Sequence, residues 1–161
     1  MALREYIRER FREFLLVPLR ELTDEEFRTA VLLGLASAPL TVVENWFLSS
    51  GPFTARPMSG VAFGVACLAV GYLYAGRPTA VRRAGKRAGF VGSSPFLVWW
   101  AVAASTGSLA AGAGQAVAVV VALVGLSLGL LVLPLVGMAF AIVGGWLRGK
   151  VAARGAVASG A

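Results

Sequence analysis

Residues 116–146 read AVAVVVALVGLSLGLLVLPLVGMAFAIVGGW, a run of thirty-one residues without a single charge. About 20 apolar residues in a helix cross the hydrocarbon core of a bilayer. As a helix the run would extend about 46 Å against a core of about 30 Å, whereas two spans would need about 36–40 apolar residues plus a turn. The run therefore predicts one transmembrane helix, whose excess length is absorbed by tilt, protrusion or a kink at Pro134.

The composition of the chain is that of a membrane protein. Of its 161 residues, 58% are apolar and 14% are charged, which lies outside the usual soluble range. Histidine, the commonest general base and metal ligand, is absent, and the single cysteine, Cys67, rules out an internal disulfide. The sequence contains no nucleophile–base pair, metal-ligand cluster or phosphate-binding loop. We therefore expect no enzymatic activity, no metal and no cofactor.

Three further apolar segments predict an all-α, integral membrane four-helix bundle within residues 23–147. The expected spans are residues 29–49, 57–75, 88–107 and 116–146. Thr23 and Glu26 form a capping box that sets the start of the first span. Pro39, Pro95 and Pro134 each remove a helical hydrogen bond and predict kinks. Gly60 with Gly64, and Gly125 with Gly129, have the four-residue spacing that lets helices approach closely in lipid.

Both ends of the chain differ from the apolar domain. In residues 1–22 apolar side chains recur every three or four positions, which predicts an amphipathic helix too polar to span a membrane. This helix either lies on the membrane surface, folds back onto the protein or docks on a partner. Residues 148–161 form a basic and then flexible tail.

The basic residues predict the orientation in the cell membrane. Six lie in residues 1–28, five in 76–87 and three in the tail, against one, Arg56, in the remaining two connections. Positive charge accumulates in cytoplasmic segments. The distribution therefore places both termini in the cytoplasm, and it explains the formal charge of +7 without a nucleic-acid partner.

Two groups of polar residues are candidates for function. Glu44, Asn45, Ser93 and Ser94 lie within or beside the apolar segments, and Glu44 is the only acid there. An ionisable residue inside a membrane suggests function, but the position of Glu44 five residues from the end of its run favours an interfacial carboxylate. The second group sets topology or contacts anionic lipid headgroups, and comprises Arg77, Arg82, Arg83, Lys86 and Arg87.

Three segments carry a resemblance to a known family: GYLYAG (71–76), RRAGKRAGFVGSSP (82–95) and VGGWLRGKVA (143–152). Over residues 52–152 the chain resembles a family of small four-span membrane proteins of unknown function, widespread in halophilic archaea. The preference for Arg over Lys fits the GC-rich genomes of such organisms. The resemblance implies a membrane bundle and no catalytic residues.

Two functions of different classes follow. The first is a non-enzymatic membrane protein that works through contacts, as a self-associating bundle or an accessory subunit. Its partners would be membrane lipids, copies of itself or another membrane protein. The alternative is a small oligomeric transporter or pore that uses Glu44 together with the kinked helices.

Overall fold

A computed structural model describes residues 25–48, 58–110, 112 and 114–159. This part of the chain is all-α, as predicted, and contains no strand. The amphipathic helix expected in residues 1–22, Thr23 of the capping box and Arg56 lie outside the described residues. A 3-10 turn, η1 (Glu25–Phe27), precedes five α-helices: α2 (Arg28–Leu48), α3 (Val61–Leu73), α4 (Pro78–Gly92), α5 (Ser94–Ala110) and α6 (Gln115–Ser159).

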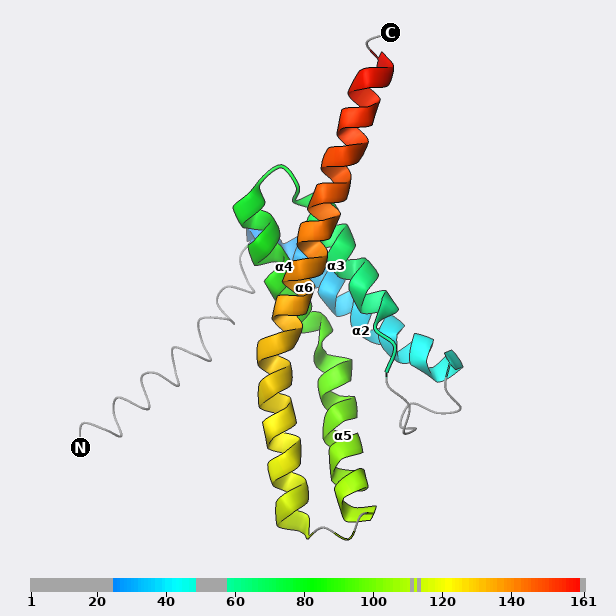
Figure 1. Cartoon of the computed structure of the whole chain (residues 1–161), viewed down its shortest axis with the longest axis vertical. Coiled ribbons are helices and arrows are strands. Elements are labelled where there is room, and N and C mark those ends of the chain that lie inside the picture. Colours follow the sequence, from blue (N-terminus) through cyan, green and yellow to red (C-terminus); the bar gives the residue numbers. More distant parts are fainter. Residues whose placement is uncertain (1–24, 49–57, 111, 113, 160–161) are drawn as a thin grey trace, which may run out of the picture.

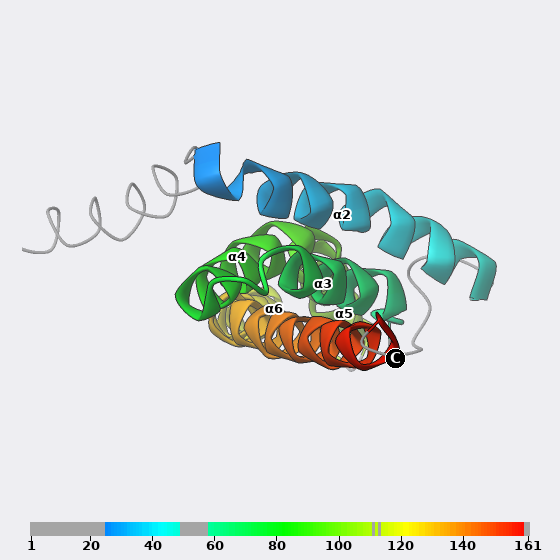
Figure 2. The same ribbon diagram turned by 90° about the horizontal axis from the view of Figure 1, so that it is seen from above.

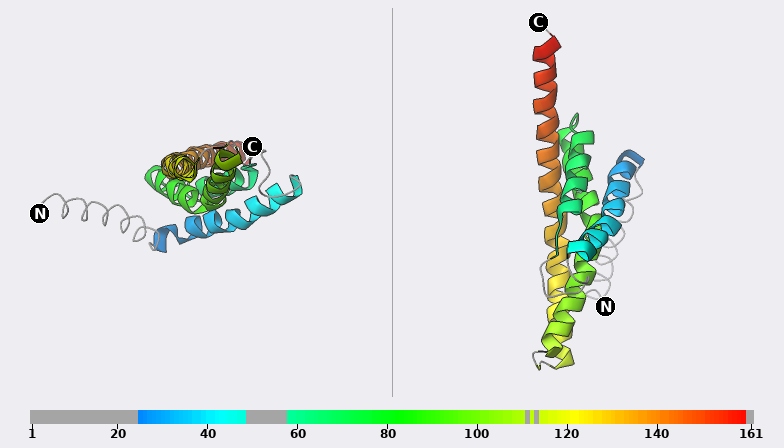
Figure 3. Two further views of the ribbon diagram at one scale, coloured as in Figure 1. Left: turned by 90° about the horizontal axis from the view of Figure 1, so that it is seen from below. Right: turned by 90° about the vertical axis from the view of Figure 1, so that its right-hand side faces the viewer.

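The helices form three layers. α3 and α4 lie side by side in the middle layer, with α2 crossing one face and α6 covering the other (Figure 2). α6 runs the length of the molecule, and its first half forms an antiparallel hairpin with α5 that extends beyond the other helices (Figures 1 and 3). The hairpin turn and the C-terminal end of α6 therefore lie at opposite ends of the molecule.

Two helical segments are long and apolar enough to cross a membrane. Glu25–Leu48 and Gln115–Arg154 are each long and apolar enough to cross a bilayer, and the bent pair α4–α5 would supply a third span. The predicted second span is represented by α3, which has 13 residues. A helix of this length extends only about 20 Å, less than a hydrocarbon core of about 30 Å. Length and composition thus identify two or three spans.

The third predicted span, residues 88–107, is divided at Ser93. Thr79–Gly92 and Ser94–Gly107 meet at an angle of 42°. Pro95 has no amide hydrogen to donate to the carbonyl of Val91, and its ring cannot be accommodated against that turn in a straight helix. The bend therefore lies beside Pro95, whereas Pro39 and Pro134 lie within the continuous helices α2 and α6.

Two segments outside the predicted spans are helical. The basic connection of residues 76–87 largely belongs to α4, because Pro78 occupies the first turn, where its missing amide costs nothing. The tail predicted to be flexible continues α6 as far as Ser159, in a stretch with four alanines between Val151 and Ser159, which favour helix. The basic residues mark the ends of the apolar stretches, but α4 and α6 include them and remain helical.

The outer surface of the described helices is rich in large apolar side chains. The inward face of α2 is small or polar, whereas its large side chains point outward, among them Leu32, Leu35, Leu40 and Phe47, the last 83% exposed. Many more large apolar side chains are exposed along α6. The inward residues of α2 are Ala30, Gly34, Ser37, Thr41 and Asn45.

Glycines allow the layers to touch backbone to backbone. A Cβ atom on Gly137 would lie 2.6 Å from the Cα of Gly89, and one on Gly34 would lie 2.6 Å from the carbonyl oxygen of Ala88. Cβ atoms on Gly71 and Gly144 would overlap the backbones of Ala141 and Leu68 respectively. Side chains larger than hydrogen at these positions would force the helices apart.

The glycines predicted from their spacing make contacts of a different kind. Gly125 lies against the indole of Trp100 and Gly129 against the side chain of Leu97, both from α5. Gly60 and Gly64 face the rings of Phe96 and Phe140 at distances close to ordinary van der Waals contact. The predicted pairs therefore receive side chains, and the closest backbone approaches involve other glycines.

Candidate functional site

The end of α2 is joined to the start of α3 by a cluster of three polar side chains, Glu44, Asn45 and Ser59. One carboxylate oxygen of Glu44 accepts a hydrogen bond from the Ser59 hydroxyl, and the other accepts from the backbone amide of Ala62 at 3.0 Å. The Asn45 side chain donates to the Ser59 carbonyl at 2.9 Å and accepts from the Ser59 amide at 2.7 Å. Four hydrogen bonds thus connect two consecutive residues of α2 to the entry of α3.

Glu44 acts as an N-terminal cap for a helix to which it does not belong. α3 starts at Val61, and its own N-cap residue, Gly60, has no side chain with which to cap it. The first amides of a helix lack partners within the helix and carry partial positive charge. The half-buried carboxylate of Glu44 satisfies one of these amides and places a negative charge at the favourable end of the helix dipole.

Asn45 ends a ladder of buried polar side chains along α2. Ser37 donates to the carbonyl of Gly34 at 2.7 Å, Thr41 to that of Ser37 at 2.8 Å, and Asn45 to that of Thr41 at 2.8 Å. Each buried polar group is thereby paired within its own helix, which removes most of the cost of burying it. The ladder lets α2 turn a polar but satisfied face toward α3 and α4.

At its C-terminal end α3 is capped by the side chain of Arg148. Arg148 of α6 donates to the carbonyls of Tyr72 and Leu73, at 3.0 and 3.1 Å. These carbonyls belong to the last turn of α3, where acceptors lack helical partners and a cation is favourable. α3 is therefore capped at both ends by charges of the appropriate sign, supplied by α2 and α6.

A second contact group joins the start of α2 to the α3–α4 turn. The Tyr74 hydroxyl donates to the Glu26 carbonyl at 2.8 Å, and Arg77 forms an ion pair with the Glu26 carboxylate at 3.0 Å. The Phe27 ring stacks on Tyr74 and lies 4.0 Å below the guanidinium of Arg87. These contacts fix the end of the molecule where α4 begins.

The five basic residues predicted to set topology or contact lipid headgroups have different environments in the structure. Arg87 is only 8% exposed and packs over Phe27, and Arg77 is paired with Glu26. Arg82, Arg83 and Lys86 are exposed on one face of α4. Four of the five candidates for headgroup contact thus lie on the surface, one of them paired with Glu26, and only Arg87 is buried.

The four predicted polar candidates do not meet at one place. Asn45 and Ser94 both line a cleft between α2 and α5. Ser93 is buried and donates to the carbonyl of Phe90 at 2.6 Å, within its own turn. Glu44 is directed to the start of α3. Within the described ranges, no three His, Cys, Asp or Glu side chains are placed to hold a metal ion.

Two residues of the capping arrangement were not identified from the sequence. Ser59 lies directly before Gly60 and an apolar run, which is a signal for a helix start that could have been used. Arg148 had no such signal, because its acceptors lie about 75 residues earlier in the chain. Only the packing of α6 on α3 brings them together.

Comparison with known proteins places the chain in a family. No curated protein and no solved structure matches it. The model of a family of unknown function, DUF5518, matches residues 27–151, which extends from the start of α2 into the last part of α6. The matched range includes both capping residues of α3, Glu44 and Arg148, and begins directly after Glu26. The chain belongs to the DUF5518 family of unknown function.

Proposed function

We propose that this chain is a multi-pass protein of the cell membrane that crosses the bilayer four times and works through contacts rather than chemistry. The observation that carries the proposal is the apolar outer surface. Large apolar side chains cover the outside of α2 and α6, while the inward face of α2 is small or polar and most of the buried apolar residues of the core are alanines. In water this arrangement would expose a large apolar surface, whereas in lipid it is favourable.

The charges support an orientation with both termini in the cytoplasm. α4, which carries Arg82, Arg83 and Lys86, begins toward the end of the molecule at which α6 ends (Figure 1), and Arg148 of α6 bonds to the last turn of α3 just before α4. The α5–α6 turn at the opposite end is uncharged in residues 107–115. In this orientation the exposed cations of α4 face the cytoplasmic leaflet, where each contributes about 1 kcal/mol of attraction to anionic headgroups.

α3 would make the fourth crossing despite its length. Its capped ends support this crossing, because Glu44 pairs one amide of the first turn and Arg148 pairs two carbonyls of the last turn, so that less unpaired backbone faces lipid. Flanking residues and the neighbouring helices would complete the crossing.

Glu44 fits a structural role better than transport. Both of its carboxylate oxygens accept hydrogen bonds from Ser59 and Ala62, and a carboxylate held in this way stabilises the α2–α3 connection. The exposed apolar faces favour an interaction or accessory protein, or a self-associating bundle, over an enzyme or a transporter.

Topology can be tested with single cysteines in a Cys67→Ala background. In intact cells, an impermeant maleimide should label Gly112→Cys from outside. It should label Arg82→Cys and Arg154→Cys only after permeabilisation. Labelling of Arg82→Cys in intact cells would contradict the orientation, and failure of the protein to stay with membranes after alkaline extraction would contradict membrane insertion.

The contact role requires a separate experiment. Gentle extraction followed by native mass spectrometry should yield a complex larger than the monomer, containing either further copies or a second membrane protein. In proteoliposomes, Glu44→Gln should leave ion and solute flux equal to that of the unaltered protein. A flux that is present and then lost in Glu44→Gln would favour the transporter instead.

A further inference from the structure

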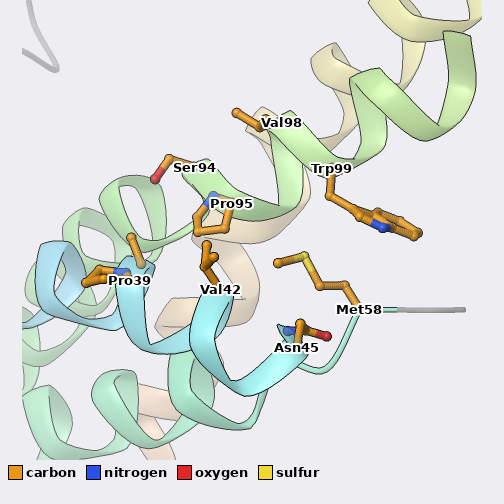
Figure 4. A pocket seen from close by; sticks show the side chains of 9 residues that line it. Pro39, Val42, Asn45, Met58, Ser94, Pro95, Val98 and Trp99 are labelled. Atoms are coloured by element: carbon orange, nitrogen blue, oxygen red, sulfur yellow. The ribbon is translucent and has the colours of Figure 1, made fainter. Parts of the chain in front are cut away.

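A cleft of about 330 Å³ lies between α2 and α5. Figure 4 shows Pro39 and Val42 of α2, Met58, and Pro95 and Trp99 of α5 arranged around it. None of the described residues that line it is charged. Its volume is at the lower end of the range of about 300–1,000 Å³ that is typical of ligand sites.

The bend at Ser93 creates the cleft. Before the bend, α4 touches α2 closely, with Gly34 against Ala88 and Gly92 against the Ser37 hydroxyl. After the bend, α5 leaves this direction by 42° and diverges from α2. The opening is therefore a consequence of the backbone path and does not depend on the rotamer of one side chain.

The chemistry of the lining calls for an apolar ligand. Asn45 is the most polar residue of the wall, but its amide group already bonds to Thr41 and Ser59. Apart from the exposed Ser94 hydroxyl, the wall offers no partner to a charged or strongly polar ligand, which would lose its hydration at a cost of several kcal/mol. A hydrocarbon ligand has no such requirement.

The cleft is open rather than enclosed. Both walls continue into exposed apolar surface, since Val42 is 43% and Val98 is 58% exposed. The cleft is thus open to the medium that surrounds α2 and α5.

We propose that the cleft binds one hydrocarbon chain of a membrane lipid, seated between α2 and α5 against Trp99. The inference rests on the proposed membrane location, because only there are lipid chains the surrounding medium. A chain bound in this way fills the space opened by the bend and lets α5 diverge from α2 without leaving a void.

Photolabelling of the full chain tests the proposal. The probe is a phosphatidylcholine with a diazirine in the middle of one acyl chain, present in trace amounts in vesicles of phosphatidylcholine and phosphatidylglycerol. Mass spectrometry should find labelling concentrated at Met58, Val98 and Trp99 relative to the exposed residues of α6. In Ala38→Trp, whose indole would occupy the cleft, labelling there should fall about tenfold, equivalent to 1.4 kcal/mol of binding free energy.

Ala36→Trp is the matched control, because Ala36 lies on the same helix but on its exposed side. It should label like the unaltered chain. If Ala38→Trp does not fold, Val98→Trp fills the cleft from the opposite wall and should give the same loss. Equal labelling of the cleft and of α6, or equal labelling of both Ala→Trp variants, would overturn the proposal.

Two further outcomes separate this inference from the membrane proposal. Crosslinks between two copies at Met58 or Trp99 would assign the cleft to self-association and overturn lipid binding. If the chain fails to float with the vesicles, the membrane location itself is wrong. If it floats but the cleft is not labelled preferentially, only the lipid site is wrong.

Discussion

Two regions of the molecule pack their helices in opposite ways. In the glycine-packed region, where α3 and α4 meet α6, the backbones of Gly89 and Gly137 touch, as do those of Gly144 and Leu68. In the α5–α6 hairpin, formed by α5 and residues 115–130, large side chains separate the helices, with the Trp100 indole over Gly125. A side chain can rotate away from an obstacle, but a helix backbone cannot, so the two regions should respond differently to added volume.

The largest effect is expected in the glycine-packed region. Gly144→Val should destabilise the protein by more than about 3 kcal/mol, the upper end of the usual cost of overpacking, because the new Cβ meets the carbonyl of Leu68. Thermal unfolding in detergent, followed by circular dichroism, measures this. Gly149→Val on the same helix is the control, since nothing lies within 4 Å of its added Cβ; equal melting of the two variants would contradict the backbone contact.

In the α5–α6 hairpin we expect a smaller loss of stability, which a second substitution can rescue. Gly125→Val should cost about 1–3 kcal/mol, because its Cβ meets the Trp100 ring. Adding Trp100→Ala should recover much of the loss and give a coupling energy above about 0.5 kcal/mol. Leu68→Ala should not rescue Gly144→Val, because the obstacle there is a backbone atom. Rescue in both regions, or in neither, would remove the distinction between them.

An intermediate effect is expected at the N-terminal cap of α3, where the contact of Glu44 depends on charge and hydrogen bonding rather than on close packing. Glu44→Ala should lower the free energy of unfolding by about 1–2 kcal/mol, as for the loss of a helix cap with its dipole interaction. Glu44→Gln should lose less, because the amide oxygen can still accept a bond. Glu25→Ala, at an exposed position, provides the control. Glu44→Ala that melts like this control would show that the cap does not stabilise α3.

The smallest effect is expected at the surface. Arg77 and Glu26 pair at 3.0 Å with side chains 76% and 51% exposed, and exposed pairs contribute less than about 1 kcal/mol. Arg77→Ala should therefore shift the melting temperature slightly at low salt and not at all at high salt, where the attraction is screened. A large shift that persists in high salt would show that Arg77 stabilises the turn by packing.

Apolar length predicted the long helices, whereas contacts between distant residues could not be predicted. The first span, expected at 29–49, corresponds to α2 at Arg28–Leu48, because both its ends are marked by polar residues. The third span was predicted as one helix with a kink at Pro95. The structure divides it into two helices at 42°, because hydropathy shows the length of an apolar segment but not a change in the direction of its helix axis. The helical nature of residues 78–87 was missed because their charges were interpreted as signals of topology or of contact with lipid headgroups, and neither interpretation specifies secondary structure.

The candidate site was predicted in part. Glu44 and Asn45 were selected because polar residues are rare in apolar runs, and an interfacial carboxylate was favoured over a transport residue. Their partner Ser59 lies 14 or 15 residues away, and no periodicity connects the two segments. The inward face of α2 was encoded by small and polar residues spaced three or four apart, a pattern that a search for apolar faces overlooks.

The double capping of α3 has a consequence for the order in which the chain is made. Glu44 precedes α3 on the ribosome, so the first turn of α3 has its partner as soon as it emerges. Arg148 is synthesised about 75 residues after Leu73, and at about 5–20 residues per second this interval lasts several seconds. During that time the carbonyls of Tyr72 and Leu73 at the C-terminal end of α3 lack the partner that α6 later provides. A chain that stops before Arg148 leaves these two carbonyls of α3 without that partner.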